Sequence, residues 1–220
     1  MPLQLNDLLD NRYRILATLG KGGMGAVYRA EDTRLGVIVA VKENLFTTAE
    51  YARQFRREAT LLATLHHRHL PRVTDHFVID GHGQYLVMDF IPGHDTRQIL
   101  EERGPIPEIE VVRWGLQVCS ALSYMHSLNP AVLHRDIKPG NIKITPDGEA
   151  YLVDFGLAKV QESSATTTGA RAVTPGFSPP EQYGAGRTDA RSDVYSLGAT
   201  FYNLLTGLVA ADGLARAIGT

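Results

Sequence analysis

The sequence HRDIKPGN at residues 134–141, followed by DFG at residues 154–156, decides the fold of this chain. The charged and amide groups of chemical interest in it are Asp136, Lys138, Asn141 and Asp154. Carboxylate and amide oxygens are the ligands that Mg²⁺ prefers in proteins. An amine two residues from a carboxylate can neutralise charge on a nearby anion. The segment therefore predicts a site for a metal ion and an anionic group.

Upstream of this segment, residues 20–25 read GKGGMG and match the pattern G-x-G-x-x-G. Glycines allow the backbone to approach phosphate oxygens closely and to donate N–H groups to them. A dinucleotide-binding fold would need a helix from Gly25 and an acid about twenty residues on, which Glu43 could supply. Residues 26–32 are β-prone and a turn-like stretch follows them. We therefore expect the loop to join two strands, which disfavours the dinucleotide alternative.

A lysine follows on the third predicted strand, in Val39-Ala40-Val41-Lys42. Glu58 lies sixteen residues further on, in a segment, 49–65, whose apolar residues recur at helical spacing. A lysine that holds phosphates needs an acid to fix its position, and a helix facing the sheet can supply one. Behind a glycine loop, the pair indicates phosphate binding.

Taken together and in this order, these motifs resemble those of the protein kinase family. The glycine loop with its Val-Ala-Val-Lys strand is similar to that of the bacterial eukaryotic-like Ser/Thr kinases. The resemblance runs from about Tyr13 to the C-terminus. It implies an α+β, bilobal fold, with a lead-in at 1–12 and a partial, mainly helical C-lobe at 91–220. The N-lobe, at 13–90, would be a five-stranded antiparallel sheet with one helix.

The resemblance also implies catalytic and metal-binding roles. Asp136 would accept or orient the proton of the substrate hydroxyl, and Lys138 would reach the γ-phosphate. Asn141 and Asp154 would bind Mg²⁺, with Mn²⁺ as an alternative ion. Lys143 departs from the family pattern, because this position usually carries an apolar residue beneath the adenine.

The implied cofactor is ATP. Lys42, held by Glu58, would bind its α and β phosphates, and Met88 falls at the gatekeeper position. The backbones of Asp89 and Ile91 would bond the adenine edge. The implied ATP-binding set is Leu19, Gly20, Lys21, Gly22, Gly23, Met24, Gly25, Val27, Ala40, Lys42, Met88, Asp89, Ile91 and Asp95.

Regulation is expected in the loop at residues 163–188, which is rich in Ser, Thr, Gly and Pro. Arg135, beside Asp136, implies a loop phosphate that the guanidinium could bind. The first candidate acceptors are Thr166, Thr167 and Thr168. Thr174 falls where the Ser/Thr class places a threonine near the base.

Two acidic residues are expected to have structural roles. Asp193 would begin a buried helix that runs to about Thr206 and bond the catalytic-loop backbone, and residues 194–211 carry no charge. That run suits a core helix better than a membrane span. The chain is short for this family, so we expect a C-terminal truncation. Glu181 would then lie unpaired beside an exposed flank of the helix, because Arg216 is too close in sequence to pair with it.

Composition and residue counts limit the partners, the compartment and the metal sites that we expect. The formal charge of −2 gives no argument for nucleic acid as a partner. The single cysteine, Cys119, suits a reducing, cytoplasmic compartment, and we expect it to be packed. This chain should contain no membrane segment, although an anchor could follow it. The histidines at 66, 67 and 69 suggest metal ligands, but a structural His67 fits better because no cysteine lies near.

The sequence therefore predicts phosphoryl transfer from ATP to Ser and Thr hydroxyls of protein substrates. Activation-loop autophosphorylation, with self-association in trans, is the expected regulation. The alternative is an inactive truncated kinase or pseudokinase that acts as a binding module, against which the complete set of motifs argues.

Overall fold

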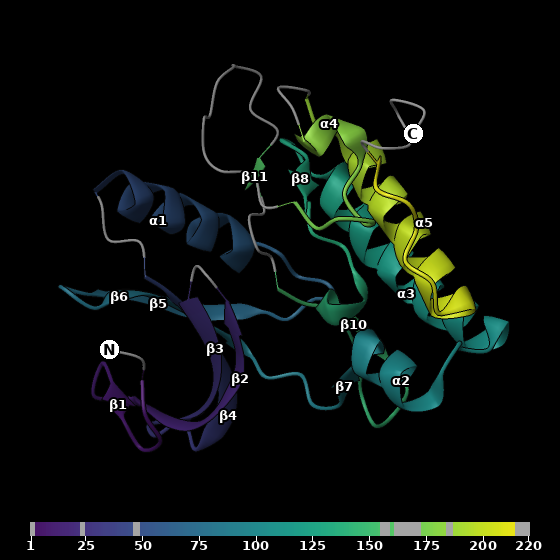
Figure 1. Cartoon of the computed structure of the whole chain (residues 1–220). Helices are drawn as coiled ribbons and strands as arrows, with labels where there is room; N and C mark the ends of the chain where they lie inside the picture. Colours follow the sequence, from purple (N-terminus) through teal and green to yellow (C-terminus); the bar gives the residue numbers. More distant parts are fainter. Residues whose placement is uncertain are drawn as a thin grey trace. The chain divides into compact units, whose positions relative to one another are not determined.

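The computed structural model describes most of the chain (Figure 1), namely residues 3–22, 25–45, 49–154, 159–160, 173–183 and 187–213. The chain divides into two compact units. Unit 1 consists of residues 1–66 and 71–91, and unit 2 of residues 67–70 and 92–220. The short segment 67–70 thus belongs to unit 2 although its neighbours on both sides belong to unit 1.

Unit 1 is built on a six-stranded antiparallel sheet in the order β1-β2-β3-β4-β6-β5. The strands are β1 (Leu8–Leu9), β2 (Tyr13–Gly22), β3 (Gly25–Asp32), β4 (Val37–Asn44), β5 (Val73–Ile79) and β6 (Gly83–Asp89). Five of these are the predicted strands. The sixth, β1, lies in the expected lead-in and pairs with residues 13–14 of β2. Its two residues are too few to give a periodic signal in the sequence.

The two faces of the unit 1 sheet differ in composition. One face carries the core, in which Tyr13, Tyr28, Val41, Tyr85 and others are almost fully buried. Alternate residues along each strand point to opposite faces. The residues between these core positions, Lys42 among them, therefore lie on the second face.

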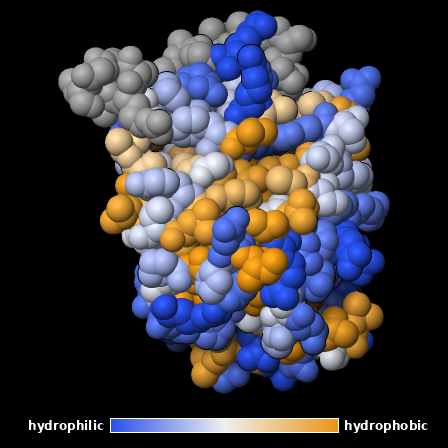
Figure 2. All heavy atoms as spheres, turned by 90° about the vertical axis from the view of Figure 1, so that its right-hand side faces the viewer, coloured by the Kyte–Doolittle hydropathy of each residue, from blue (hydrophilic) through white to orange (hydrophobic). Residues whose placement is uncertain are grey.

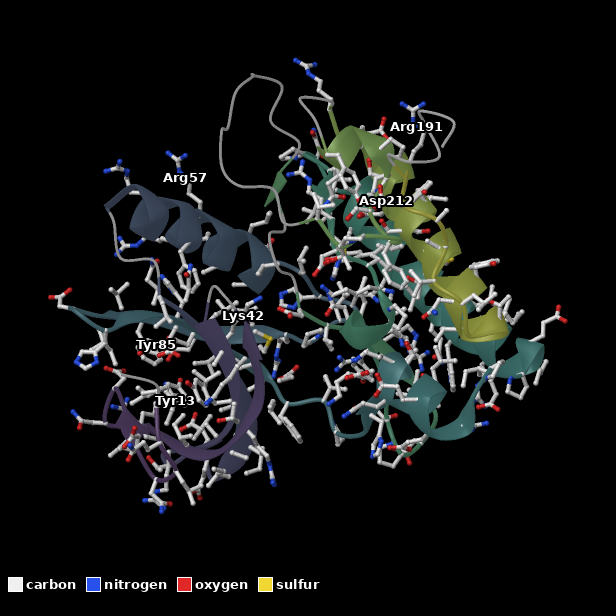
Figure 3. The ribbon with its side chains drawn as sticks, viewed as in Figure 1. Tyr13, Lys42, Arg57, Tyr85, Arg191 and Asp212 are labelled. Carbon is white, nitrogen blue, oxygen red and sulfur yellow. The ribbon has the colours of Figure 1, made fainter. Side chains whose placement is uncertain are left out.

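The single helix of unit 1 is α1 (Ala49–Ala63), which contacts β5 and β6. Its apolar positions at Ala59 and Leu62 are buried. Arg53, Arg56 and Arg57 are exposed, and Figure 3 shows Arg57 pointing away from the ribbon. The helix is thus amphipathic, as its periodicity predicts.

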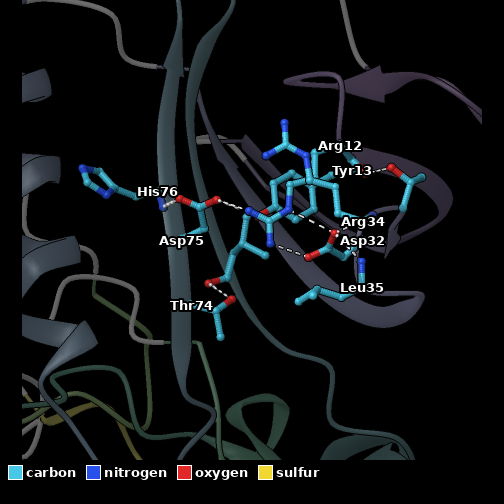
Figure 4. A network of polar contacts seen from close by, with 10 residues as sticks. Arg12, Tyr13, Asp32, Arg34, Leu35, Thr74, Asp75 and His76 are labelled. Atoms are coloured by element: carbon cyan, nitrogen blue, oxygen red, sulfur yellow. Dashed lines mark hydrogen bonds and ion pairs between the residues drawn. The ribbon is translucent and has the colours of Figure 1, made fainter.

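A polar network fixes the start of β2 to the rest of the sheet (Figure 4). The Arg12 guanidinium bonds Asp32 through Nε and Nη2, at 3.0 and 2.6 Å, and Asp75 through Nη1 at 3.2 Å. Tyr13 donates its hydroxyl to the same Asp75 carboxylate at 2.6 Å. The Arg12 hydrogen bonds lower the pKa of Asp32. Strands distant in sequence are held together here by charge-assisted bonds.

Unit 2 is mainly helical and carries two small sheets. Its helices are α2 (Thr96–Arg103), α3 (Glu108–Ser127), α4 (Pro180–Tyr183) and α5 (Ala190–Thr206), with a 3₁₀ turn, η1, at Pro139–Asn141. The sheets have the orders β10-β9-β7 and β11-β8, formed by β7 (His94–Asp95), β8 (Val132–Leu133), β9 (Ile142–Ile144), β10 (Ala150–Leu152) and β11 (Lys159–Val160). Helix α3 contacts both α5 and β10.

Helix α5 begins earlier than the sequence predicted. Its N-cap is Asp189, whose carboxylate accepts the Arg191 N–H at 2.8 Å, and Ser192 completes a capping box. The predicted start at Asp193 was therefore wrong, because Asp189 supplies the cap and Asp193 is used elsewhere. The helix ends at Gly207, whose φ of 73° suits a glycine.

Apolar side chains remain exposed on α3, on α5 and on the segment after α5. Figure 2, which views the molecule from the right-hand side of Figure 1, shows them gathered across this face. They are Ile109, Val112, Leu116, Val194, Tyr202, Leu205, Leu208 and Val209. The expected exposed flank of α5 is confirmed.

Cys119 is also exposed, so the prediction of a packed thiol was wrong. Within the described ranges, no helix is both long and apolar enough to cross a membrane.

Candidate active site

The glycine loop of unit 1 connects β2 to β3, so a strand and not a helix follows Gly25. A side chain at Gly25 would overlap the carbonyl oxygen of Glu43, so the sheet itself requires this glycine. A Cβ at Gly20 or Gly22 would meet no atom of the described residues within 4 Å. Packing therefore does not explain these two glycines, whereas close approach of a ligand would.

The second face of the unit 1 sheet brings together several predicted nucleotide-binding residues. Val27 of β3 pairs directly with Lys42 of β4, and Ala40 pairs with Met88 of β6. Directly paired residues of an antiparallel sheet lie on the same face. Ala40 and Met88 are buried, while Lys42, labelled in Figure 3, is half-buried. One face thus carries an apolar surface next to a primary amine.

The ends of β2 and β6 carry the other predicted adenine contacts. Leu19 lies on β2 and is 46% exposed. Asp89 ends β6, where its N–H donates to the Arg72 carbonyl and its carboxylate accepts the Arg72 N–H, each at 3.0 Å. Ile91 follows it and is half-buried. The Asp89 side chain is thus engaged within unit 1.

Glu43, the acid of the dinucleotide alternative, lies in the core of unit 1. Its carboxylate accepts the Tyr28 hydroxyl at 3.0 Å and the Tyr85 hydroxyl at 3.1 Å. Burial raises the pKa of both phenols, and the neighbouring carboxylate adds to the effect. Only 4% of Glu43 is exposed, so it cannot reach a ribose. Burial of this acid and the strand after Gly25 together overturn that alternative.

In unit 2 the predicted catalytic residues converge on the Asp136 carboxylate. One oxygen accepts the Thr174 hydroxyl at 2.9 Å. The other accepts the Asn141 amide at 2.9 Å and lies 2.8 Å from the Lys138 amine. Lys138 also donates to Thr174 at 3.3 Å. The carboxylate is thus oriented by three groups and already accepts a hydrogen bond from an alcohol.

His134 sets the spacing between Asp136 and the chain that leads to Asp154. Its Nδ1 accepts the Asp136 N–H at 3.4 Å, and its Nε2 lies 3.3 Å from the Val153 carbonyl oxygen. Because a carbonyl oxygen can only accept, Nε2 carries the proton and the ring is neutral. Burial lowers the pKa of His134 against the pull of nearby carboxylates, which agrees with this tautomer.

Asp193 holds the backbone of the same loop, in the arrangement that the sequence predicted. Its carboxylate accepts the N–H groups of His134 and Arg135 at 2.9 and 2.8 Å, and it is fully buried. Burial alone would raise the pKa of Asp193, but the bonds to His126 and to the loop outweigh it and the pKa is lowered. Arg135 has a φ of 65°, so the loop needs such anchoring.

Two further contacts to this loop were missed from the sequence. His126 of α3 lies 2.8 Å from Asp193 through Nε2. Gln182 of α4 donates to the Arg135 carbonyl oxygen at 2.8 Å. Both partners are distant along the chain, and neither belongs to a motif quoted above. Only the spatial arrangement reveals them.

Asp95 and Lys143 lie side by side on the three-stranded sheet of unit 2. They are direct partners in the β7–β9 pairing, and Tyr151 pairs with Lys143 on the other side. Asp95 also caps α2 by accepting the Gln98 N–H at 2.9 Å. Burial lowers the pKa of Lys143, and the Asp95 carboxylate opposes this shift. The cation therefore lies beside an acid rather than on an apolar surface.

Glu181 differs from expectation, because its carboxylate has a partner. The Ser192 hydroxyl of α5 donates to it at 2.6 Å. The prediction of an unpaired Glu181 was therefore wrong. The donor belongs to the first turn of α5, which lies before the start predicted for this helix.

Several predicted residues lie outside the described part of the chain. They are Gly23, Met24, Phe155, Gly156, Thr166, Thr167 and Thr168. The backbone of Glu58 is described within α1, whereas its side chain is not.

The donor set around Asp136 suits a hard divalent cation. Asn141 uses its Nδ2 amide protons for Asp136, which leaves its Oδ1 as an oxygen donor. Asp154 carries a further carboxylate and has a φ of 58°, and its neighbour Val153 donates its N–H to the Asn141 carbonyl oxygen at 2.9 Å. Mg²⁺ commonly takes one or two protein oxygens together with substrate phosphates and water. In the described ranges, no group of three or more His, Cys, Asp and Glu residues is placed to hold a metal ion.

The histidine segment after α1 makes specific contacts within unit 2. His67 lies 3.1 Å from Ser120 through Nε2 and stacks on Tyr124. His69 bonds the Ala150 carbonyl oxygen through Nδ1 at 2.9 Å and is 5% exposed. Burial lowers the pKa of both rings.

A hairpin-forming glycine loop followed by a lysine on one sheet, and an oriented aspartate with oxygen donors on a helical unit, are features of the protein kinase class. The family model described as the protein kinase domain matches residues 13–214. The chain therefore belongs to the protein kinase family.

The proteins to which the chain is similar include bacterial serine/threonine-protein kinases. The serine/threonine-protein kinase PknL of Mycobacterium tuberculosis is 41% identical over 204 residues, covering 91% of this chain and 50% of PknL. The serine/threonine-protein kinase pkn2 of Myxococcus xanthus is 37% identical, covering 94% of this chain and 26% of that protein. The chain thus spans half the length or less of these relatives.

Among solved structures, the kinase domain of Mycobacterium tuberculosis PknI is similar, with a TM-score of 0.77 and 29% identity. The match covers 97% of this chain and 79% of that domain. The predicted α+β kinase fold is confirmed.

Proposed function

We propose that this chain transfers the γ-phosphoryl group of ATP to serine and threonine hydroxyls of proteins. The observation that carries the proposal is the Asp136 carboxylate, oriented by Lys138 and Asn141 and bonded to an alcohol, Thr174. A substrate hydroxyl in the place of the Thr174 hydroxyl would give its proton to Asp136. Its oxygen would form the new bond to phosphorus as the bond to ADP breaks.

The other residues act by positioning and by charge. Lys138 neutralises the phosphoryl oxygens in the transition state. Asn141 and Asp154 would hold Mg²⁺, or Mn²⁺ in its place, which would supply positive charge to balance the phosphates. Lys42 would hold the α and β phosphates, with Glu58 as the acid that fixes its position.

The remaining nucleotide contacts follow the family pattern. Gly20 and Gly22 leave room for phosphate oxygens. Val27, Ala40 and Met88 supply the apolar surface for the adenine. The ribose contact falls to Asp95 and the edge contacts to the backbones of Asp89 and Ile91.

Regulation by phosphorylation is part of the proposal. Arg135 would bind a phosphothreonine of the loop at 163–188, formed by a second copy of the chain acting in trans. The protein substrate is otherwise defined only by its acceptor hydroxyl.

The deciding experiment measures phosphate incorporation from Mg-ATP into a basic Ser/Thr substrate by the wild type and by Asp136→Asn. An amide cannot accept the proton, so we expect a loss of about 10²- to 10⁴-fold. Asp147→Asn, in the exposed turn between β9 and β10, is the matched control and should keep full activity. Equal incorporation by wild type and Asp136→Asn would sink the assignment. Binding of Mg-ATP without transfer by the wild type would favour the binding-module alternative.

A further inference from the structure

β10 is an edge strand of the three-stranded sheet, and it leads within two residues to Asp154. Its peptide groups alternate between two sides. Those of Glu149 and Val153 bond the chain around β9, through the Thr145 N–H and the Asn141 carbonyl, each at 2.9 Å. The peptide groups of Ala150 and Leu152 face the opposite side, where buried backbone polar groups still need partners.

Two residues outside the sheet, His69 and Gln117, form hydrogen bonds to the peptide groups on this second side. His69 donates through Nδ1 to the Ala150 carbonyl at 2.9 Å, and its own carbonyl accepts the Leu152 N–H at 2.9 Å. Gln117 of α3 accepts the Ala150 N–H at 2.7 Å and donates to the Glu149 carboxylate at 2.9 Å. His69 and Gln117 thus take the place of a neighbouring strand.

We propose that His69 and Gln117 are positioning residues for Asp154, and that they act by fixing the edge of β10. The proposal rests on the proposed function, in which Asp154 binds Mg²⁺. Asp154 has a φ of 58°, a conformation that few non-glycine residues adopt unless the surrounding structure holds it. The side-chain bonds of His69 and Gln117 hold Ala150, four residues before Asp154, and the His69 carbonyl holds Leu152. Loss of the side-chain bonds therefore frees the edge of the strand that leads to Asp154 and leaves the turn there less constrained.

The bond to Ala150 needs a proton on Nδ1 of His69, which the neutral ring can supply. The charged and titratable groups around it are Arg68, His67, Glu149 with its Oε2 at 4.0 Å from Nδ1, and Tyr151, whose ring lies edge-on to the imidazole. An asparagine can place an N–H donor close to the Nδ1 position and does not titrate. His69→Asn therefore keeps the bond, whereas His69→Leu removes it.

The experiment measures the Mg²⁺ concentration that gives half-maximal phosphate transfer, at fixed ATP and peptide substrate. Residues that support a metal ligand typically change metal affinity by 10- to 100-fold when replaced. We expect His69→Leu and Gln117→Leu to raise this concentration about tenfold, with the KM for the peptide unchanged. His69→Asn should stay near the wild type.

His67→Leu is the matched control: it removes the His67 contacts with Ser120 and Tyr124 on α3 and with the His69 N–H at 3.2 Å, but it leaves the His69 side chain and its bond to Ala150 in place. It should reduce stability without changing the Mg²⁺ requirement. A folded His69→Leu with the wild-type requirement, or an equal shift in His67→Leu, would overturn the proposal.

A second readout needs no turnover, so it separates this inference from the proposed function. Amide exchange at Leu152 and Val153, measured without nucleotide, should quicken severalfold in His69→Leu and stay unchanged in His67→Leu. If the wild type transfers no phosphate, the proposed function fails and the exchange rates alone decide the positioning role. Unchanged exchange in His69→Leu would then contradict it.

Discussion

Each unit of this protein buries a carboxylate, and the two carboxylates do different work. Glu43 in unit 1 is 4% exposed and accepts two tyrosine hydroxyls. Asp193 in unit 2 is 0% exposed and accepts two backbone N–H groups, with His126 as a third neighbour. Both satisfy the rule that buried charges need hydrogen-bond partners.

The two carboxylates differ in the kind of structure to which their hydrogen-bond donors belong. Tyr28 and Tyr85 are residues of regular strands, whose geometry the β-ladder already fixes. His134 and Arg135 belong to a loop with a positive φ at Arg135, and no ladder holds them. The same chemistry therefore adds stability in unit 1 and defines the position of the loop that carries Asp136 in unit 2.

The largest expected effect follows from Asp193→Asn. An amide group cannot accept at both positions, so one backbone N–H of the loop would face an NH₂ group. A displacement of about 1 Å in a catalytic group can cost about 10²-fold, and we expect a loss of that size in kcat. The unfolding free energy, measured in urea, should fall by about 1–3 kcal/mol.

Asp189→Asn is the control on the same helix. Asparagine caps helices about as well as aspartate, so kcat and stability should barely change. If Asp193→Asn kept the wild-type kcat, the contrast between the two carboxylates would be lost.

Acidification should weaken unit 2 before unit 1. Burial lowers the pKa of His67, His69 and His134, so the folded state binds fewer protons than the unfolded state. Their contribution is fully present above a pH of about 6.5, the unfolded value, and is lost as the pH falls toward the folded values. Each proton taken up on unfolding lowers stability by about 1.4 kcal/mol per pH unit.

In unit 1 the corresponding group is Asp32, whose pKa is lowered by its bonds to Arg12. Its contribution is lost only as the pH falls below about 3.9. Amide exchange at pH 7 and pH 5, corrected for the intrinsic rate, should therefore show loss of protection at Leu133 and Leu152 and not at Val41. Equal losses in both units would contradict this order.

Local signals predicted most of the regular structure. The β-prone residues of 26–32, the Val-Ala-Val-Lys run at 39–42 and the glycines of 20–25 predicted strands and a hairpin, because these are properties of neighbouring residues. The start of α5 could also have been found, since Asp189 and Ser192 have the spacing of a capping box. The start was instead predicted at Asp193, because the charge-free run at 194–211 begins directly after it.

The missed contacts are long-range. Glu43 lies 15 residues from Tyr28 and 42 from Tyr85, and Asp193 lies 67 from His126. Periodicity and caps carry no information over such separations. The contacts at the edge of β10 are also long-range. His69 and Gln117 bond this edge in place of a neighbouring strand, and no local sequence pattern predicts that.

The smallest expected effect is that of a substitution at Glu43, the buried carboxylate of unit 1. Glu43→Gln keeps one acceptor oxygen, so one tyrosine hydroxyl loses its carboxylate partner and must reorient toward the amide. We expect the unfolding free energy to fall by about 1 kcal/mol, the usual contribution of one hydrogen bond, and kcat to stay within about twofold, since the strands hold Lys42 through their own ladder. Urea unfolding and steady-state kinetics measure both quantities.

Asn44→Gln, next to Glu43 at the end of β4, is a control that leaves the carboxylate intact. A large loss of kcat in Glu43→Gln, with stability unchanged, would mean that the unit 1 carboxylate positions the site as Asp193 does.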